Sequence, residues 1–258
     1  MQKRRTVACY RQISTIAVMT HTVSASLRGI SSMATKALLT DFCAQYLDKT
    51  GVQVPIESVG GVDAAKRVQA GEAFDLVLLA ADAIQRLLDA GHLLPGSRCD
   101  WVDSPVAVAV SSHVTPPDIS SEAQLRAAVL AAPSLSYSTG PSGTYLEQLF
   151  TRWGVMDELK PRIVVPPPGT PVGLLLAQGK AALGFQQRSE LMNQADIILV
   201  GDLPPEVACI TRFSAAIGAA AAQDETRSQA AGSFMEFLAS PEQRDSKRRH
   251  GMYWTDNI

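Results

Sequence analysis

The chain has 258 residues, of which 46% are hydrophobic and 19% charged, and its formal net charge is −2. This length and composition suit a soluble globular protein with one large domain or two of ordinary size. The small net charge gives no electrostatic case for nucleic acid or an acidic membrane as a partner. Basic clusters occur only near the two ends, at 3–5 and 247–250, where solvated termini explain them.

Residues 1–26 form an N-terminal extension or a weak signal segment. Basic residues at 3–5 and 11 precede a modestly apolar stretch at 13–23, and Thr15, Thr20, His21 and Thr22 dilute that stretch. It therefore lacks the apolar core of a strong signal peptide. No stretch of the chain approaches the roughly 18 apolar residues of a membrane span. A working signal predicts a periplasmic protein, and without one we expect a cytoplasmic protein.

From residue 28 onward strands alternate with helices, which favours a parallel α/β architecture. Residues 29–32 read as a turn, and an amphipathic helix follows that ends at Gly51, its expected C-cap. The next expected elements are a strand at 52–59, helix 62–70, strand 74–79, helix 83–90 and a strand at 106–110.

Ser120 or Ser121 is the expected N-cap of the helix that follows. A short strand at 135–137 then leads through a Ser/Thr/Gly/Pro turn into a helix from Thr144. The remaining expected elements are a strand at 163–165, a helix at 174–178, strands at 181–185, 197–200 and 210–219, a helix at 233–238 and a last helix that starts at 240–242.

The alternation pauses twice, around 100–106 and 204–212, and both pauses are extended stretches. Two strands that cross between halves divide a chain into a discontinuous lobe and an inserted lobe, with a hinge and a cleft between them. We therefore expect lobe 1 to hold 27–104 and 207–258, and lobe 2 to hold 105–206.

Four segments share one pattern, a strand followed by a short Ser/Gly/Thr/Pro turn and a helix start. They lie at 29–32, 58–62, 138–143 and 168–172. Such turns present unpaired backbone N–H groups and hydroxyl donors, which can bind an anion without a positive side chain. In open parallel sheets they lie where ligands bind. Taken singly, each is also explained as an ordinary capped turn.

Other common sites find no support in the sequence. Walker, Gly-x-Gly-x-x-Gly and Gly-x-Ser-x-Gly patterns are absent, which argues against nucleotide binding and serine hydrolysis. Cys9, Cys43, Cys99 and Cys209 are far apart and read as buried or incidental thiols. We expect no metal site and no cofactor.

Residues 184–189 are the second feature of interest. Gln186, Gln187 and Arg188 follow the expected strand, and two amides with a guanidinium can hold a carboxylate, Arg188 in bidentate form. The alternative is an exposed helix start in which all three face water. Asp75 and Asp82 flank an apolar strand end, where capping or structural roles are favoured over general-base roles.

The chain resembles the type II periplasmic binding proteins, and within them the molybdate-binding-protein-like branch. The residues that carry the resemblance lie at 29–32, 59–66, 73–80, 137–143 and 182–187, and the similarity spans about 28–252. It implies two α/β lobes that close on a small anion, with Ser31, Ser32, Gly61, Ser138 and Thr170 in the ligand shell. Their neighbours in the same segments and the three polar residues that follow the expected strand complete the set, and the expected ligand-binding residues are Ser31, Ser32, Gly60, Gly61, Ser138, Thr139, Ser142, Gly143, Thr170, Gln186, Gln187 and Arg188.

The chain departs from the molybdate binders at Gln186, Gln187 and Arg188, where those proteins place less polar residues. This favours a di- or tricarboxylate over a molybdate-type oxyanion. We expect a monomeric solute-binding protein that delivers this anion to an ABC-type membrane transporter.

Two alternatives remain open. A similar-looking branch of the fold that the resemblance implies includes aconitate isomerase, which interconverts trans- and cis-aconitate, a reaction that requires a base. Glu57, Asp75 and Asp82 are candidates for it. A cytoplasmic ligand sensor that acts through a partner would fit the weak signal segment.

Overall fold

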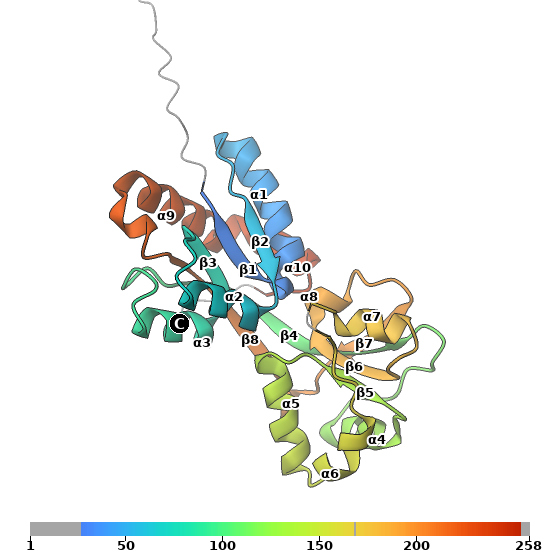
Figure 1. Ribbon diagram of the computed structural model, residues 1–258. Coiled ribbons are helices and arrows are strands. Elements are labelled where there is room, and N and C mark those ends of the chain that lie inside the picture. Colours follow the sequence, from blue (N-terminus) through green and yellow to red (C-terminus); the bar gives the residue numbers. More distant parts are fainter. Residues whose placement is uncertain (1–26, 168, 254–258) are drawn as a thin grey trace, which may run out of the picture.

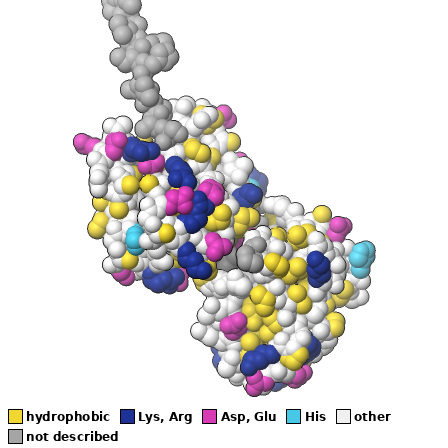
Figure 2. All heavy atoms as spheres, viewed as in Figure 1, with side chains coloured by type: hydrophobic (Ala, Val, Ile, Leu, Met, Phe, Trp, Pro, Cys, Tyr) yellow, Lys and Arg dark blue, Asp and Glu magenta, His cyan; other side chains and the backbone are white. Residues whose placement is uncertain are grey.

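The computed structural model describes residues 27–253 apart from Pro168. The expected extension or signal segment at 1–26 thus lies outside the described residues. The molecule consists of two lobes joined by a narrower middle (Figures 1 and 2). Each lobe is a sheet with helices on both faces, so the predicted two-lobe α/β fold is confirmed.

Three neighbouring strands of the lobe 1 sheet are parallel, and the next strand along the sheet is antiparallel to them. β1 (Gly29–Ser32) lies between β2 (Ile56–Val59) and β3 (Leu76–Ala80), and β3 pairs antiparallel with β8 (Ile210–Ile217). Leu76 and Leu78 pack into one hydrophobic cluster, while Val77 and Leu79 pack into another on the opposite face. Burial on both faces explains why this strand is a continuous apolar run.

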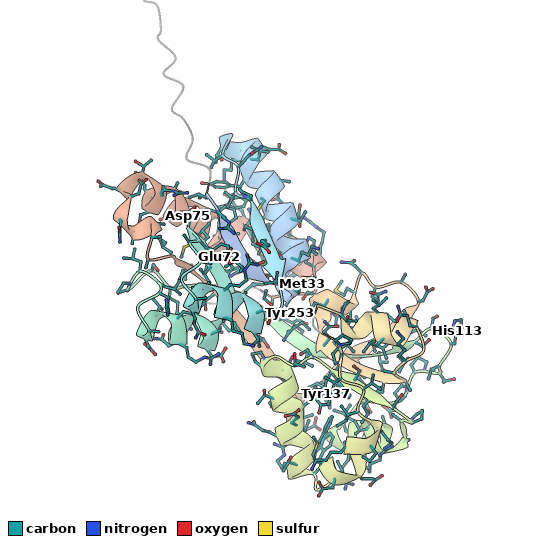
Figure 3. All side chains as sticks on the ribbon, viewed as in Figure 1. Met33, Glu72, Asp75, His113, Tyr137 and Tyr253 are labelled. Atoms are coloured by element: carbon teal, nitrogen blue, oxygen red, sulfur yellow. The ribbon has the colours of Figure 1, made fainter. Side chains whose placement is uncertain are left out.

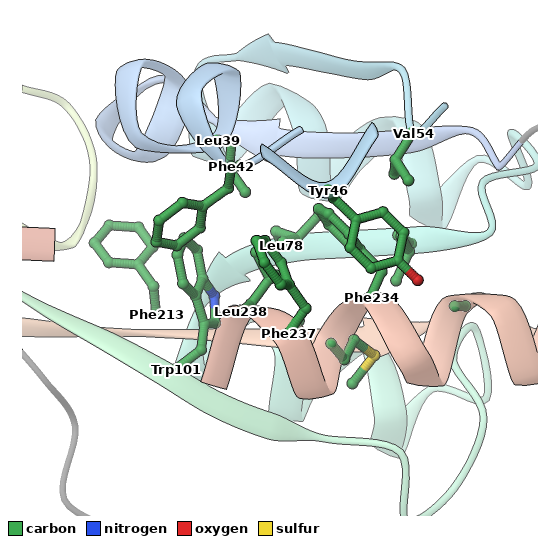
Figure 4. Close-up of a cluster of buried hydrophobic side chains, with 14 of the residues drawn as sticks. Leu39, Phe42, Tyr46, Val54, Leu78, Trp101, Phe213, Phe234, Phe237 and Leu238 are labelled. Carbon is green, nitrogen blue, oxygen red and sulfur yellow. The ribbon is translucent and has the colours of Figure 1, made fainter. Parts of the chain in front are cut away.

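Helices cover both faces of that sheet (Figure 1). α1 (Lys36–Thr50) and α9 (Glu225–Ala239) supply Phe42, Tyr46, Phe234 and Phe237 to the larger cluster, which also holds Trp101 (Figure 4). α2 (Gly61–Gln69) and α3 (Ala81–Asp89) cover the other face. The C-terminal α10 (Arg244–Arg249) completes the lobe.

Lobe 2 is built around β6 (Leu183–Gln187). It pairs parallel with β5 (Leu135–Tyr137) and antiparallel with β4 (Cys99–Ser111), which also pairs with β7 (Ile197–Asp202). The helices are α4 (Glu122–Ala131), α5 (Pro141–Arg152), α6 (Met156–Leu159), α7 (Val172–Ala177) and α8 (Arg188–Leu191). Ser121 accepts from Gln124 N, which confirms it as the N-cap of α4.

β4 runs through both lobes. Its first part, as far as Pro105, pairs with β8, and from Val106 it pairs with β6. The chain returns from lobe 2 to lobe 1 beside this point. There Val106 N donates to the Cys209 carbonyl (2.8 Å), and β8 begins at the next residue. Both crossings occur at the pauses seen in the sequence. The residue boundaries given above for the lobes stay a prediction.

Three local predictions were wrong. Residues 29–32 form β1 and not a turn, because parallel pairing on both sides outweighs the local preference of Gly and Ser for turns. The expected strand at 163–165 is a single bridge between Leu135 and Ile163. The helix predicted at 233–238 is part of the longer α9, which begins at Glu225 after its N-cap Asp224. No described helix has the length and apolar character needed to cross a membrane.

Candidate functional site

The predicted ligand residues of lobe 1 lie together at the ends of β1 and β2. Ser31 is opposite Ser58, and their hydroxyl oxygens are 2.7 Å apart. Ser32 caps the short 3-10 helix η1 (Met33–Thr35), accepting from Ala34 N at 3.4 Å. At Gly61, a Cβ would lie 3.5 Å from the Ser32 hydroxyl, so the first turn of α2 faces Ser32.

The predicted residues of lobe 2 at 138–143 form the turn from β5 into α5. The hydroxyl oxygens of Ser138 and Ser142 are 2.8 Å apart. Gly143 has to be glycine, because a Cβ there would collide with the Ser138 carbonyl oxygen. Thr139 is exposed, and Gly140, the N-cap, brings no side chain to the first turn. Pro141 has no N–H and Thr144 N donates to the Gly140 carbonyl, so the Ser142 and Gly143 N–H groups remain available to a ligand.

Figure 3 locates these two groups. Met33, next to Ser32, lies where the lobes meet, and Tyr137, next to Ser138, lies in lobe 2. Ser189 of α8 joins the two lobes beside Met33, since its Oγ donates to the carbonyl of the next residue, Ala34, at 2.7 Å. Thr170 is half-buried before α7, and its N–H donates to the Pro167 carbonyl.

Gln186 and Gln187 are the last two residues of β6. The prediction that they follow the strand is therefore wrong. Successive strand residues point to opposite faces of the sheet. Gln186 accepts from Gly173 N (3.4 Å) and donates to Glu190 Oε1 (2.7 Å). Gln187 instead donates to Thr211 Oγ1 (2.7 Å). The two amides therefore face different surroundings.

Arg188 makes an ion pair with Asp202 at 2.9 Å. The other Asp202 oxygen accepts from the Tyr253 hydroxyl at 3.2 Å. This arrangement connects α8 and β7 of lobe 2 to the C-terminal segment of lobe 1. A bidentate hold of Arg188 on a ligand carboxylate would have to compete with it.

Glu190 is a candidate that the sequence did not reveal. The residue as a whole is half-buried, with its carboxyl group beside Gln186, and burial of that group raises its pKa to about 7, although the amide hydrogen bond opposes the shift. A carboxyl group with a pKa near neutrality can take up and release protons at physiological pH. No sequence signal points to it, because the chain changes from strand to helix between Gln186 and Glu190.

The three acids considered as bases are held in ion pairs in lobe 1. Two hydrogen bonds from Arg67 lower the pKa of Glu57. Asp75 accepts from Arg28 N (2.7 Å) and from Arg227 Nη2 (3.1 Å), and Figure 3 shows it away from lobe 2. Asp82 is exposed and pairs with Arg86. Across the described residues, no three His, Cys, Asp or Glu side chains gather as a metal site would need.

Comparisons with known proteins agree with this architecture. Over 223 residues the chain is 31% identical to an aconitate isomerase from a Pseudomonas species, covering 83% of this chain and 82% of that protein. The periplasmic molybdate-binding protein of Azotobacter vinelandii has a similar structure, with a TM-score of 0.72 and 20% identity, covering 90% of this chain and all of that one (100%).

A third similar protein is the substrate-binding domain of a putative molybdenum ABC transporter from Clostridium difficile. Its TM-score is 0.67 at 16% identity, covering 90% of this chain and 99% of that domain. Residues 27–253 match the model of one family, described as bacterial extracellular solute-binding protein. The match takes in every described residue, and the chain belongs to the family of bacterial extracellular solute-binding proteins.

Proposed function

We propose that this protein binds a small di- or tricarboxylate between its two lobes and delivers it to an ABC-type transporter outside the cytoplasm. The observation that carries this proposal is the Ser138–Ser142 hydroxyl pair at the start of α5, where the backbone N–H groups lack a side-chain cap. Hydroxyl and N–H donors at a helix start suit a carboxylate group.

The arrangement of lobe 1 supports the same proposal. Ser31, Ser32 and the first turn of α2 form a second group of neutral donors, close to the Ser189–Ala34 contact between the lobes. A ligand that engages both groups would hold the lobes together, as transport by a hinged binding protein requires. Family membership supports a location outside the cytoplasm.

A thermal-shift screen tests the binding proposal. Molybdate, sulfate, citrate, succinate and both aconitates are the probes, because a ligand that binds only the folded state raises Tm. We expect stabilisation by a carboxylate and not by molybdate or sulfate. Titration calorimetry should then show that Ser138→Ala weakens binding by about 1–3 kcal/mol, the cost of a lost donor to a desolvated charge.

Thr151→Ala is the matched control for that variant. Thr151 is exposed near the other end of α5, and its hydroxyl bonds only to the Glu147 carbonyl. The Thr151→Ala substitution should leave the affinity for the carboxylate unchanged. Stabilisation by molybdate alone would refute the carboxylate proposal, and equal affinity of the Ser138→Ala variant would refute the site.

A second candidate function, isomerisation of aconitate, is favoured by the 31% identical aconitate isomerase and by Glu190. In this reaction a base removes a proton from an allylic carbon and returns one at the far end of the allyl system, so the double bond shifts. Glu190, half-buried and with a pKa of about 7, has suitable acidity for it.

Incubation with trans-aconitate, followed by chromatographic detection of cis-aconitate, tests the second candidate. Glu190→Gln should abolish turnover if this carboxyl group carries the proton. Glu206→Gln, an exposed substitution in lobe 2, is the control and should retain it. Absence of turnover at high protein concentration would exclude the enzyme and leave the binding function.

A further inference from the structure

Two buried polar atoms near the crossing point of the lobes have no hydrogen-bond partner among the described residues. They are Ser104 Oγ on β4 and Gln187 Oε1 on β6, and the two residues are 0% and 6% exposed. Such atoms are rare in folded proteins because each costs desolvation free energy. A third, Trp101 Nε1, lies in the core of lobe 1, so Ser104 and Gln187 are the pair next to the hinge.

The strand register places both side chains on one face of the sheet. Val106 is directly opposite Gln187, and Ser104 is directly opposite Thr211. Opposite residues point to the same side, and so do residues two apart on β4. Ser104 is therefore the diagonal neighbour of Gln187, at a typical Cα separation of about 7–8 Å. The hydrogen bond from Gln187 to Thr211 confirms the shared face.

This face is also the one that α5 covers. Val106 and Phe185, the neighbours of Ser104 and Gln187 on the same face, pack with Leu146 and Phe150 of α5. Tyr137 pairs with Phe185, so β5 ends and the Ser138 turn begins beside the last residues of β6. In Figure 1, α5 starts next to the strands that cross between the lobes. Gln187 thus lies at the end of lobe 2 that carries Ser138 and Ser142, and Ser104 lies beside it on the strand that crosses between the lobes.

The chemistry of the two atoms restricts what can pair with them. Gln187 Nε2 is used by Thr211, and Oε1 can only accept a hydrogen bond. The Ser104 hydroxyl can donate one. An alcohol group on a ligand satisfies both, because it donates to Gln187 Oε1 and accepts from Ser104 Oγ. An ionised carboxylate only accepts, and it would meet the lone pairs of Gln187.

We propose that Ser104 and Gln187 bind a hydroxyl group on the carbon chain of the ligand, so that the protein selects hydroxylated di- or tricarboxylates over the same acids without the hydroxyl. This inference rests on the proposed binding of small carboxylates. Both atoms are enclosed in this conformation, so the proposal requires that the lobes separate at the hinge before the ligand binds.

Paired acids that differ only in one hydroxyl test the inference. Citrate and tricarballylate (propane-1,2,3-tricarboxylate) carry the same three carboxylates, and malate and succinate form a second pair. Titration calorimetry at pH 7.5 should show that at least one hydroxyl acid binds about tenfold tighter than its counterpart. The reason is that the acid without the hydroxyl leaves two buried protein groups unpaired.

The decisive variant is Ser104→Ala. It should reduce that preference to near unity while the affinity for the acid without the hydroxyl stays the same. It should not lower Tm of the unliganded protein, because no hydrogen bond is lost. Ser136→Ala is the matched control: this serine is equally buried in lobe 2, but its hydroxyl bonds to the Val164 carbonyl. That variant should lower Tm and keep the hydroxyl preference.

The possible failures are distinguishable. Equal affinity for the acids of a pair in the wild-type protein overturns the inference and leaves the proposed function intact. The same holds if the Ser104→Ala variant retains the preference, since Ser104 would then not contact the ligand hydroxyl. Tighter binding of trans-aconitate than of citrate also overturns it, because aconitate has no hydroxyl. If the protein binds none of these acids, the proposed function is refuted together with this inference.

Discussion

The Ser189 hydroxyl of lobe 2 donates a hydrogen bond of 2.7 Å to the Ala34 carbonyl of lobe 1. Both residues are buried, and Ala34 follows the Ser31–Ser32 end of β1 by two residues. The contact therefore ties the start of α8 directly to the predicted ligand residues of the other lobe. Any hinge motion that moves α8 away from η1 has to break it.

Ser189→Ala should lower the free energy of unfolding by about 1–2 kcal/mol, because the Ala34 carbonyl would remain buried without a partner. It should also favour separation of the lobes, seen as a larger radius of gyration in X-ray scattering of the unliganded protein. Ser136→Ala loses a buried hydrogen bond within lobe 2 and should destabilise the fold without this expansion. An unchanged radius for both variants would show that the Ser189 contact does not control the hinge.

Gly143→Ala should lower stability by about 1–3 kcal/mol, since the new methyl group collides with the Ser138 carbonyl and forces the turn and α5 apart. Carboxylate affinity should fall with it, because Ser138 and Ser142 move. Gly140→Ala is the control: nothing lies within 4 Å of a Cβ there. As a cap substitution it should cost less than about 1 kcal/mol. Chemical denaturation and calorimetry measure both, and equal effects of the two variants would contradict the close approach at Gly143.

Glu190 should make stability depend on pH. Burial raises the pKa of its carboxyl group to about 7 in the folded protein, against an ordinary value of 4.5. Between these values Glu190 holds its proton in the folded state but not in the unfolded state, so the contribution of Glu190 to stability is greatest below about pH 4.5 and falls as pH rises to about 7. The full difference is about 3 kcal/mol at most.

Glu190→Gln mimics the protonated acid and should flatten this dependence, becoming more stable than the wild type at pH 7.5 but not at pH 4.5. Urea unfolding across this range measures the effect. The exposed Glu206→Gln substitution should keep the wild-type slope. If Glu190→Gln and wild type show parallel curves, the carboxyl group is ionised in the folded protein.

Arg188→Gln distinguishes a structural role from a ligand role. The ion pair with Asp202 is about one-third exposed on both sides (32% and 30%), so its loss should cost no more than about 1 kcal/mol in unfolding free energy. We expect carboxylate affinity to stay within about twofold, because Arg188 is engaged with Asp202. Arg152→Gln, which removes the more exposed pair with Glu122, is the control. A large loss of affinity in Arg188→Gln alone would assign the guanidinium to the ligand.

Sequence reasoning succeeded where a local pattern and the fold agree. The run Leu76–Leu79 marked a buried strand, Ser121 marked a cap, and the extended pauses marked the two crossings. It failed at 29–32, where glycine and serine suggested a turn although two neighbouring strands pair with the segment. It also failed for Gln186 and Gln187, because the end of β6 depends on pairing with β4.

Patterns within short segments were sufficient to predict the α/β class, the two lobes, the family resemblance and the hydroxyl-rich segments at 31–32 and 138–142. Which groups meet depends on the tertiary structure. It turned Gln186 toward Glu190 and Gln187 toward Thr211, engaged Arg188 with Asp202, and left Ser104 and Gln187 with unpaired atoms at the hinge. These contacts join residues from separate elements, and strand register, burial and helix packing arise only when the whole chain has folded.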